Sequence, residues 1–170
     1  MKKLLLILLA TVVAFMPGCK SSGENASANL FVKISENEKI NGDFFVYTQA
    51  YDISGEGYIS EENLSFLYYG KYEKLPEISC IQNFCIALDK SKSCREIHIF
   101  KVKNDSDVFC VERMLECRGK YLCKVQINPG ESEFFTLPPT DYTFSHKGKF
   151  VLMCIGENSE KILKTLERTI

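Results

Sequence analysis

The sequence has no net positive charge, and this lack limits what the protein can bind. Its 170 residues carry 21 Lys and Arg against 22 Asp and Glu. No stretch gathers basic residues into a stripe, whereas binding to nucleic acid depends on a positive surface of that kind. We therefore expect no nucleic-acid partner.

Motifs of the common enzyme classes are also lacking. The sequence has no nucleophile elbow, no HExxH motif, no phosphate-binding loop and no recognisable pair of catalytic acids. Its cysteines form no CxxC pair, which a thiol oxidoreductase or a short-spaced zinc site would need. We expect a protein that is not an enzyme and that carries no cofactor.

The longest apolar run is too short to be a permanent membrane span. Residues 4–15 read LLLILLATVVAF and come directly after Lys2 and Lys3. A spanning helix needs about 20 apolar residues, while the apolar core of a secretory signal has roughly 7 to 15. A basic start before a short apolar core is typical of such a signal.

This signal ends in Met16-Pro17-Gly18-Cys19, which resembles a bacterial lipobox. Lipoprotein processing needs a small residue before the cut and a thiol after it to carry the lipid; Met16 and Pro17 replace the usual Leu and Ala or Ser. We predict that residues 1–18 are removed and that Cys19 is lipidated, with diacylglycerol and an acyl chain such as palmitate. The protein would then be lipid-anchored at the extracytoplasmic face of the cell membrane. The alternative is a secretory signal with an incidental cysteine.

The chain after the signal is long enough for one domain. Cleavage leaves 152 residues with 19 basic and 22 acidic side chains. After Cys19 the stretch KSSGENASA is small and polar, so residues 19–28 are predicted to be a flexible tether. Residues 29–170 are predicted to be a single domain.

Seven further cysteines leave three interpretations open. They could be small buried hydrophobic residues, they could form one or two disulfides, or they could belong to a metal or redox site. Because seven thiols cannot all pair, at least one is free or intermolecular. The seven are Cys80, Cys85, Cys94, Cys110, Cys117, Cys123 and Cys154.

Residues 52–63 resemble a calcium loop of the EF-hand type. Oxygen-bearing side chains stand at loop positions 1, 3 and 5, as Asp52, Ser54 and Glu56, and Gly57 comes next at the turn position. Position 12 is Asn63, where the motif requires a bidentate glutamate. Calcium binding through these four polar residues is therefore one hypothesis, and a polar turn with Ser60 as the N-cap of the next helix is the other.

The rest of the chain alternates helix and strand patterns. We expect helices near 29–36, 60–69, 106–122 and 160–168, and strands near 78–88, 96–102, 141–144 and 149–155. Residues 44–51 are compatible with either a strand or a helix. The prediction is an α+β fold: a mostly antiparallel four-stranded sheet of two hairpins with helices packed on one face. The other face would be exposed or covered by residues 29–51.

The strand at 96–102 alternates, with Ile97 and Ile99 on one side and Glu96 and His98 on the other. No Ser, Cys or Asp is placed by the sequence to work with His98. We therefore predict that His98 is a surface or rim residue.

Residues 60–170 are similar to an uncharacterised family of small Gram-positive lipoproteins, classified as a domain of unknown function. The likeness lies in the pair Tyr69-Gly70, in EIHIFKVKNDSD at 96–107, in GKFV at 148–151 and in ENSEKI at 157–162. The family usually lacks this many cysteines. Because it has no assigned activity, the resemblance implies a lipoprotein location and a single domain, and no site residue.

The sequence thus predicts a membrane-anchored extracytoplasmic lipoprotein that serves as a binding or structural module. Its partners would be the membrane, through the lipid, and a protein or another envelope component. A calcium-binding module at Asp52, Ser54, Glu56 and Asn63 is the alternative, with Ca²⁺ as its ion.

Overall fold

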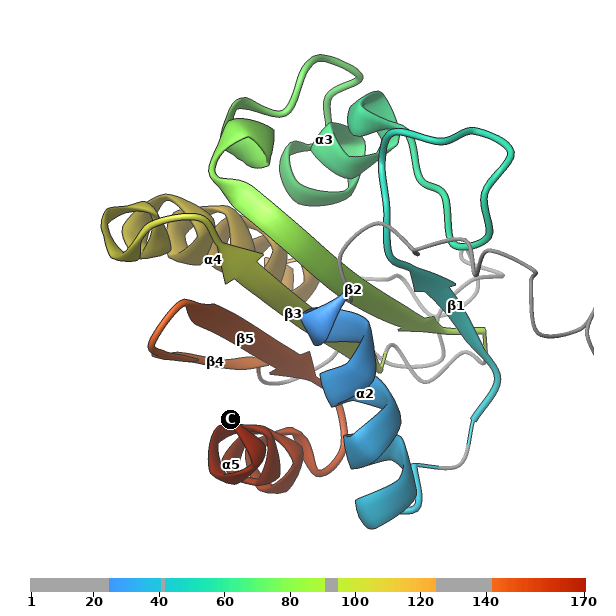
Figure 1. The fold of residues 1–170 in the computed structure, drawn as a ribbon, viewed down its shortest axis with the longest axis vertical. Coiled ribbons are helices and arrows are strands. Elements are labelled where there is room, and N and C mark those ends of the chain that lie inside the picture. Colours follow the sequence, from blue (N-terminus) through green and yellow to red (C-terminus); the bar gives the residue numbers. More distant parts are fainter. Residues whose placement is uncertain (1–24, 41, 91–94, 125–141) are drawn as a thin grey trace, which may run out of the picture.

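A computed structural model describes residues 25–40, 42–90, 95–124 and 142–170, and these form an α+β domain around one antiparallel sheet (Figure 1). The sheet has five strands in the order β1-β2-β3-β5-β4. The strands are β1 (Phe44–Tyr47), β2 (Ile81–Asp89), β3 (Glu96–Val102), β4 (Tyr142–Lys147) and β5 (Phe150–Ile155). The helices are α2 (Ala26–Asn37), α3 (Glu61–Tyr69), α4 (Val108–Lys124) and α5 (Ser159–Thr169), with short 3₁₀ turns η1 (Pro76–Ser79) and η2 (Asp105–Asp107).

The predicted fold class and both predicted hairpins are confirmed, with one strand more than expected. β2 pairs with β3 and β4 pairs with β5, each antiparallel. The fifth strand, β1, comes from the segment that the sequence left undecided between strand and helix. It pairs antiparallel with β2 at one edge of the sheet, with Phe44 opposite Asp89.

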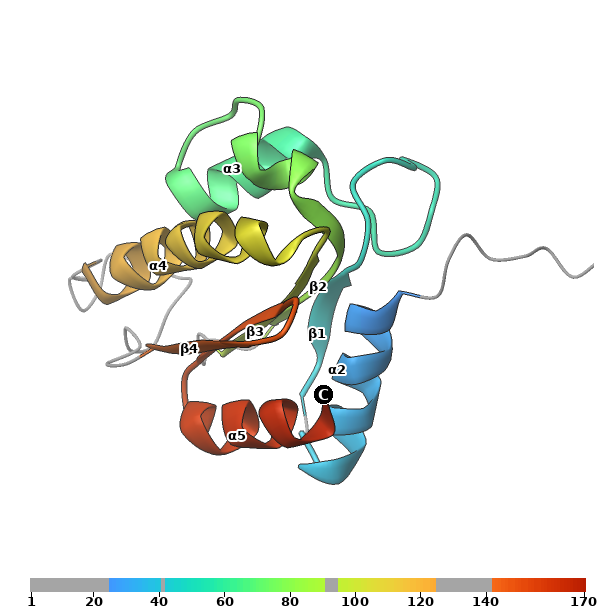
Figure 2. The same cartoon turned by 60° about the vertical axis from the view of Figure 1, so that its left-hand side comes forward.

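Helices cover both faces of the sheet, so packing on one face alone is wrong, whereas the alternative that residues 29–51 cover the other face is confirmed in part, through α2. α3 and α4 lie on one side, and α2 and α5 lie on the other (Figure 2). The reason is that β3 is buried on both of its sides: Phe100 packs toward α3 and α4, while Ile97 and Ile99 pack toward α2 and α5. Since a face of exposed apolar residues is unfavourable, both faces need a helical layer.

The domain also begins earlier than predicted, because α2 starts at Ala26, inside the segment predicted to be a tether. Asn25 caps this helix by accepting a hydrogen bond from the N–H of Ala28 at 3.0 Å. Its amide also donates to the carbonyl of Phe84 at 3.1 Å. Ser27 is buried and donates its hydroxyl to Asn83 at 2.7 Å. These small polar residues are ordered because they bond to β2.

None of the helices in the described parts of the chain has the length and apolarity that a membrane span requires. The predicted signal and Cys19 lie outside the described residues.

The packing of α4 on β4 leaves no room for a side chain at Gly119. A Cβ atom built there would lie 2.4 Å from the ring of Tyr142. We expect Gly119→Ala to lower the free energy of unfolding by up to about 2 kcal/mol. Overpacking costs about 1 to 3 kcal/mol and outweighs the roughly 1 kcal/mol that alanine gains over glycine in a helix.

Urea unfolding of residues 20–170 measures this effect, and the same substitution in a Tyr142→Leu background is its control. With the ring removed, Gly119→Ala should become neutral or stabilising. An equal loss in both backgrounds would show that Tyr142 is not the cause.

Candidate functional site

Within the described residues, four largely buried ionisable side chains form a polar network: Tyr68, Glu96, His98 and Arg118. β3 places Glu96 and His98 two residues apart, and therefore on the same face of the sheet. α3 supplies Tyr68 and α4 supplies Arg118. The network thus joins three elements on the side of the sheet that α3 and α4 cover.

His98 is bonded at both ring nitrogens. Its Nε2 lies 2.8 Å from Oε2 of Glu96, and its Nδ1 lies 2.7 Å from the hydroxyl oxygen of Tyr68. A carboxylate can only accept, so Nε2 carries the proton, and Nδ1 then accepts from the tyrosine hydroxyl. His98 is 0% exposed and Tyr68 2% exposed. The prediction of a surface or rim histidine is therefore wrong, because α3 covers this end of the strand.

Glu96 also forms a bidentate ion pair with Arg118. The guanidinium donates from Nη2 to Oε1 at 2.5 Å and from Nε to Oε2 at 3.1 Å. Its third nitrogen, Nη1, donates to the carbonyl oxygen of Leu67 near the end of α3 at 3.2 Å. Paired, charge-assisted hydrogen bonds of this geometry are among the strongest in proteins.

Burial and charge act against each other on the pKa values of this network. Burial alone would raise the pKa of Glu96, but the charge of Arg118 and the hydrogen bond from His98 outweigh it and lower the pKa to about 2. Burial lowers the pKa of His98, although Glu96 opposes that change. Burial and the negative charge of Glu96 both raise the pKa of Tyr68. The folded state therefore holds an ionised Glu96 and a neutral His98.

The arrangement resembles a proton relay in its order of groups, yet a substrate cannot reach it. The tyrosine hydroxyl and both imidazole nitrogens are already bonded inside the domain. A general base must reach the proton that it removes, within hydrogen-bond distance or through one water. This geometry favours a structural role, in which the network fixes α3 and α4 on β3.

The calcium hypothesis gains no support from the geometry of residues 52–63. An EF-hand loop lies between two helices, whereas a strand, β1, precedes this loop, and a parallel bridge between Gln49 and Tyr58 closes it. Asp52 Oδ1 accepts from the N–H and hydroxyl of Ser54, at 3.0 and 2.8 Å.

The other half of the loop begins a helix. Ser60 is the N-cap of α3 and accepts from the N–H of Asn63 at 3.1 Å, as the capped-turn hypothesis predicted. The backbone carbonyl of Glu56 accepts a hydrogen bond from the side-chain amide of Gln49 at 3.4 Å. Among the residues that the structure describes, no group of three or more His, Cys, Asp and Glu side chains is placed to hold a metal ion. Calcium binding remains an untested prediction.

The described cysteines are free thiols, and they differ in their surroundings. Cys85 and Cys154 are buried in the apolar core under α2 and α5, where burial raises the pKa of each thiol to about 12. These two fit the interpretation as small hydrophobic residues. Cys110 and Cys117 are exposed on α4, and Cys80 is half-buried. The thiols of Cys94 and Cys123 are outside the described part of the structure.

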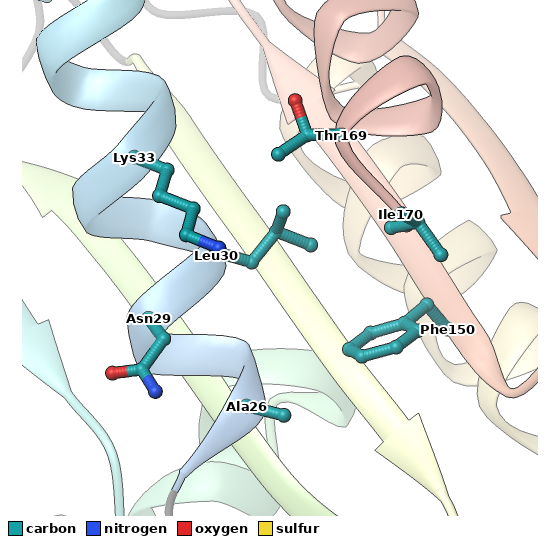
Figure 3. A pocket seen from close by; sticks show the side chains of 7 residues that line it. All are labelled: Ala26, Asn29, Leu30, Lys33, Phe150, Thr169 and Ile170. Atoms are coloured by element: carbon teal, nitrogen blue, oxygen red, sulfur yellow. The ribbon is translucent and has the colours of Figure 1, made fainter.

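An open groove lies between α2 and the end of α5, on the side of the sheet away from the polar network. Figure 3 shows Leu30 on α2 pointing across it toward Phe150 and Ile170, with Lys33 reaching over Leu30. Its volume is about 320 Å³. The lining is completed by Ala26, Asn29 and Thr169. Neither the groove nor the network was found from the sequence.

One signal for the network was present in the sequence. Glu96 and His98 fall on the same side of a strand as Phe100, so an inward-facing acid needed a buried partner. Arg118 lies within the predicted helix at 106–122 and is the kind of residue that supplies one. The sequence could not show that the two meet, because they are 22 residues apart.

We expect the free energy of unfolding to fall on acidification in two pH ranges, or windows, one for each of two groups of the network. The pKa of His98 is lowered from its ordinary 6.5, so below about pH 6.5 the unfolded chain takes up a proton that the folded chain resists, and stability falls. Glu96, lowered from 4.5 to about 2, adds a second loss below about pH 4.5. We expect His98→Gln to remove the first window in urea unfolding measured from pH 7.5 to about 5.

The matched control for that experiment is His146→Gln, because His146 is the other of the two histidines and is exposed. The control should keep the fall in stability. If stability no longer fell on acidification in His146→Gln but still fell in His98→Gln, His146 would be the cause of the fall and our assignment to His98 would be wrong.

Removing one partner of the buried ion pair should cost more than removing both. We expect Arg118→Met to lower the free energy of unfolding by about 3 to 5 kcal/mol, because it leaves the carboxylate of Glu96 buried without its cation. Adding Glu96→Gln should recover at least about 1 kcal/mol. Urea unfolding of the two single variants and the double variant measures this, and strictly additive losses would contradict it.

Comparisons with known proteins give no family for the chain: no protein-family model, no curated protein and no solved structure matches it. The resemblance to small Gram-positive lipoproteins remains a prediction.

Proposed function

We propose that this chain is a lipid-anchored module at the extracytoplasmic face of a bacterial cell membrane, and that it acts by binding and not by catalysis. The lipid would be carried by Cys19, as the lipobox-like sequence before it suggests. The partner would be a component of the membrane or of the surrounding envelope.

The observation that carries the binding role is the contrast between the two sides of the sheet. On one side, Glu96 and His98 are the groups best suited to catalysis, but both are already hydrogen-bonded to other side chains of the domain. On the other side, the groove between α2 and α5 is open and presents apolar and polar side chains in similar measure, among them an amine. Ligand sites are typically concave and mostly apolar with a few polar groups.

The anchoring role is supported by where α2 begins. Asn25 and Ser27 are fixed to β2, and five residues lie between Cys19 and Asn25, which gives six Cα-to-Cα steps. A fully extended residue spans at most about 3.6 Å, so these six span at most about 22 Å. A lipid on Cys19 would therefore hold α2 and its groove near the membrane surface.

Metabolic labelling tests the anchor. We expect the full chain, expressed in a bacterial host, to incorporate an alkyne-bearing fatty acid and to sediment with the membranes. Cys19→Ser should abolish both, whereas Cys110→Ser, which removes an exposed thiol on α4, should change neither. Labelling that persists in Cys19→Ser would contradict lipidation at this residue.

A further inference from the structure

We infer that the groove between α2 and α5 binds a long-chain carboxylate from the membrane, with its hydrocarbon chain on the apolar wall and its carboxylate beside Lys33. This inference rests on the proposed function, because it names the ligand class of the same binding module. The hydrocarbon chain and the carboxylate of the ligand would thus bind to two different features of the groove, its apolar side chains and its lysine.

The apolar wall would hold the chain. Leu30 on α2 faces Phe150 at the start of β5 and Ile170 after α5, and β3 passes behind them (Figure 3). Ile170 is 37% exposed, so a ligand that covers it removes apolar surface from water. A volume of about 320 Å³ is at the lower end of the range for ligand sites, and it favours one hydrocarbon chain over two.

Two amines give the groove its selectivity for an anion. Lys33 lies on its wall, and Lys101 extends from β3 with Nζ 5.6 Å from the centre of the Phe150 ring. Within the described residues, neither lysine forms an ion pair. The side chains that line the groove include no Asp or Glu among the described residues. A carboxylate at the open end would therefore meet the positive charge of Lys33, with that of Lys101 beyond the Phe150 ring.

The position of the groove indicates where the ligand comes from. Ala26, the first residue of α2, is part of its lining, and the segment that leads from Cys19 ends immediately before it. With at most about 22 Å between the lipid attachment and this helix, the groove stays close to the bilayer surface. Single-chain carboxylates partition into that surface, so the ligand is concentrated where the groove is held.

Photocrosslinking in isolated membranes tests the inference on the full chain. The probe is a long-chain fatty acid with a diazirine in its chain, added without ATP or coenzyme A, so that it cannot be attached enzymatically. We expect crosslinks in α2, at Phe150 or at residues 169–170, located by mass spectrometry of the peptides. The alcohol of the same chain length should crosslink at least about five-fold less.

Charge variants decide whether Lys33 selects the carboxylate. Lys33→Glu should reduce crosslinking of the acid by about five-fold or more, which corresponds to one exposed ion pair of about 1 kcal/mol, and should leave the alcohol unchanged. Lys74→Glu is the matched control, because it makes the same change of net charge in the loop after α3 and should leave both probes unchanged.

The outcomes separate this inference from the proposed function. Equal crosslinking of acid and alcohol, or crosslinks on α3 and α4, would overturn the assignment of a carboxylate to this groove, even if the chain is in the membrane fraction. If the chain is in the soluble fraction, anchoring fails; crosslinking that depends on Lys33 in that fraction would still support the groove as the binding site.

Discussion

Glu96 places a carboxylate inside the domain, and much of the structure on one side of the sheet results from the need to satisfy it. A buried charge without partners is too costly to persist, so the chain must bring a cation and hydrogen-bond donors to it. Arg118 and His98 supply these, and Tyr68 completes the set. Because these partners come from α3, β3 and α4, the same contacts that neutralise the charge also fix the two helices on the sheet.

The core on the opposite side of the sheet is apolar, and polar contacts lie only at its margins, such as those of Ser27 with Asn83 and of Glu38 with Lys161. There Ile97 and Ile99 of β3 pack with Leu30 and Ile34 of α2 and with the inward face of α5. Apolar packing has no directional requirement, so the core on this side is less specific than the polar network, and the marginal polar contacts orient the two helices. The two helices leave the groove between them at the end of the sheet where the chain enters α2.

This difference between the two sides gives the proposed function its physical basis. The polar network stabilises one specific arrangement and leaves no ionisable group of its own free for a ligand. The groove, in contrast, combines exposed apolar surface at Ile170 with the amine of Lys33, and the amine of Lys101 lies beside Phe150. A molecule with an apolar chain and an anionic head complements both features. The anchor predicted at Cys19 would hold the groove beside the membrane, which contains such molecules.

The sequence by itself determined the local structure: hydrophobic periods and caps predicted the helices, the two hairpins and the α+β class, and Ser60 caps α3 as expected. These features depend on neighbouring residues, so a linear pattern contains them. Only the tertiary structure decided that helices cover both faces, that Asn25 and Ser27 belong to the domain, and that His98 is buried. Each depends on partners 22 or more residues away, such as Arg118 for Glu96 and Asn83 for Ser27. A sequence pattern shows which way a side chain points along its own element, but packing between elements decides what lies there.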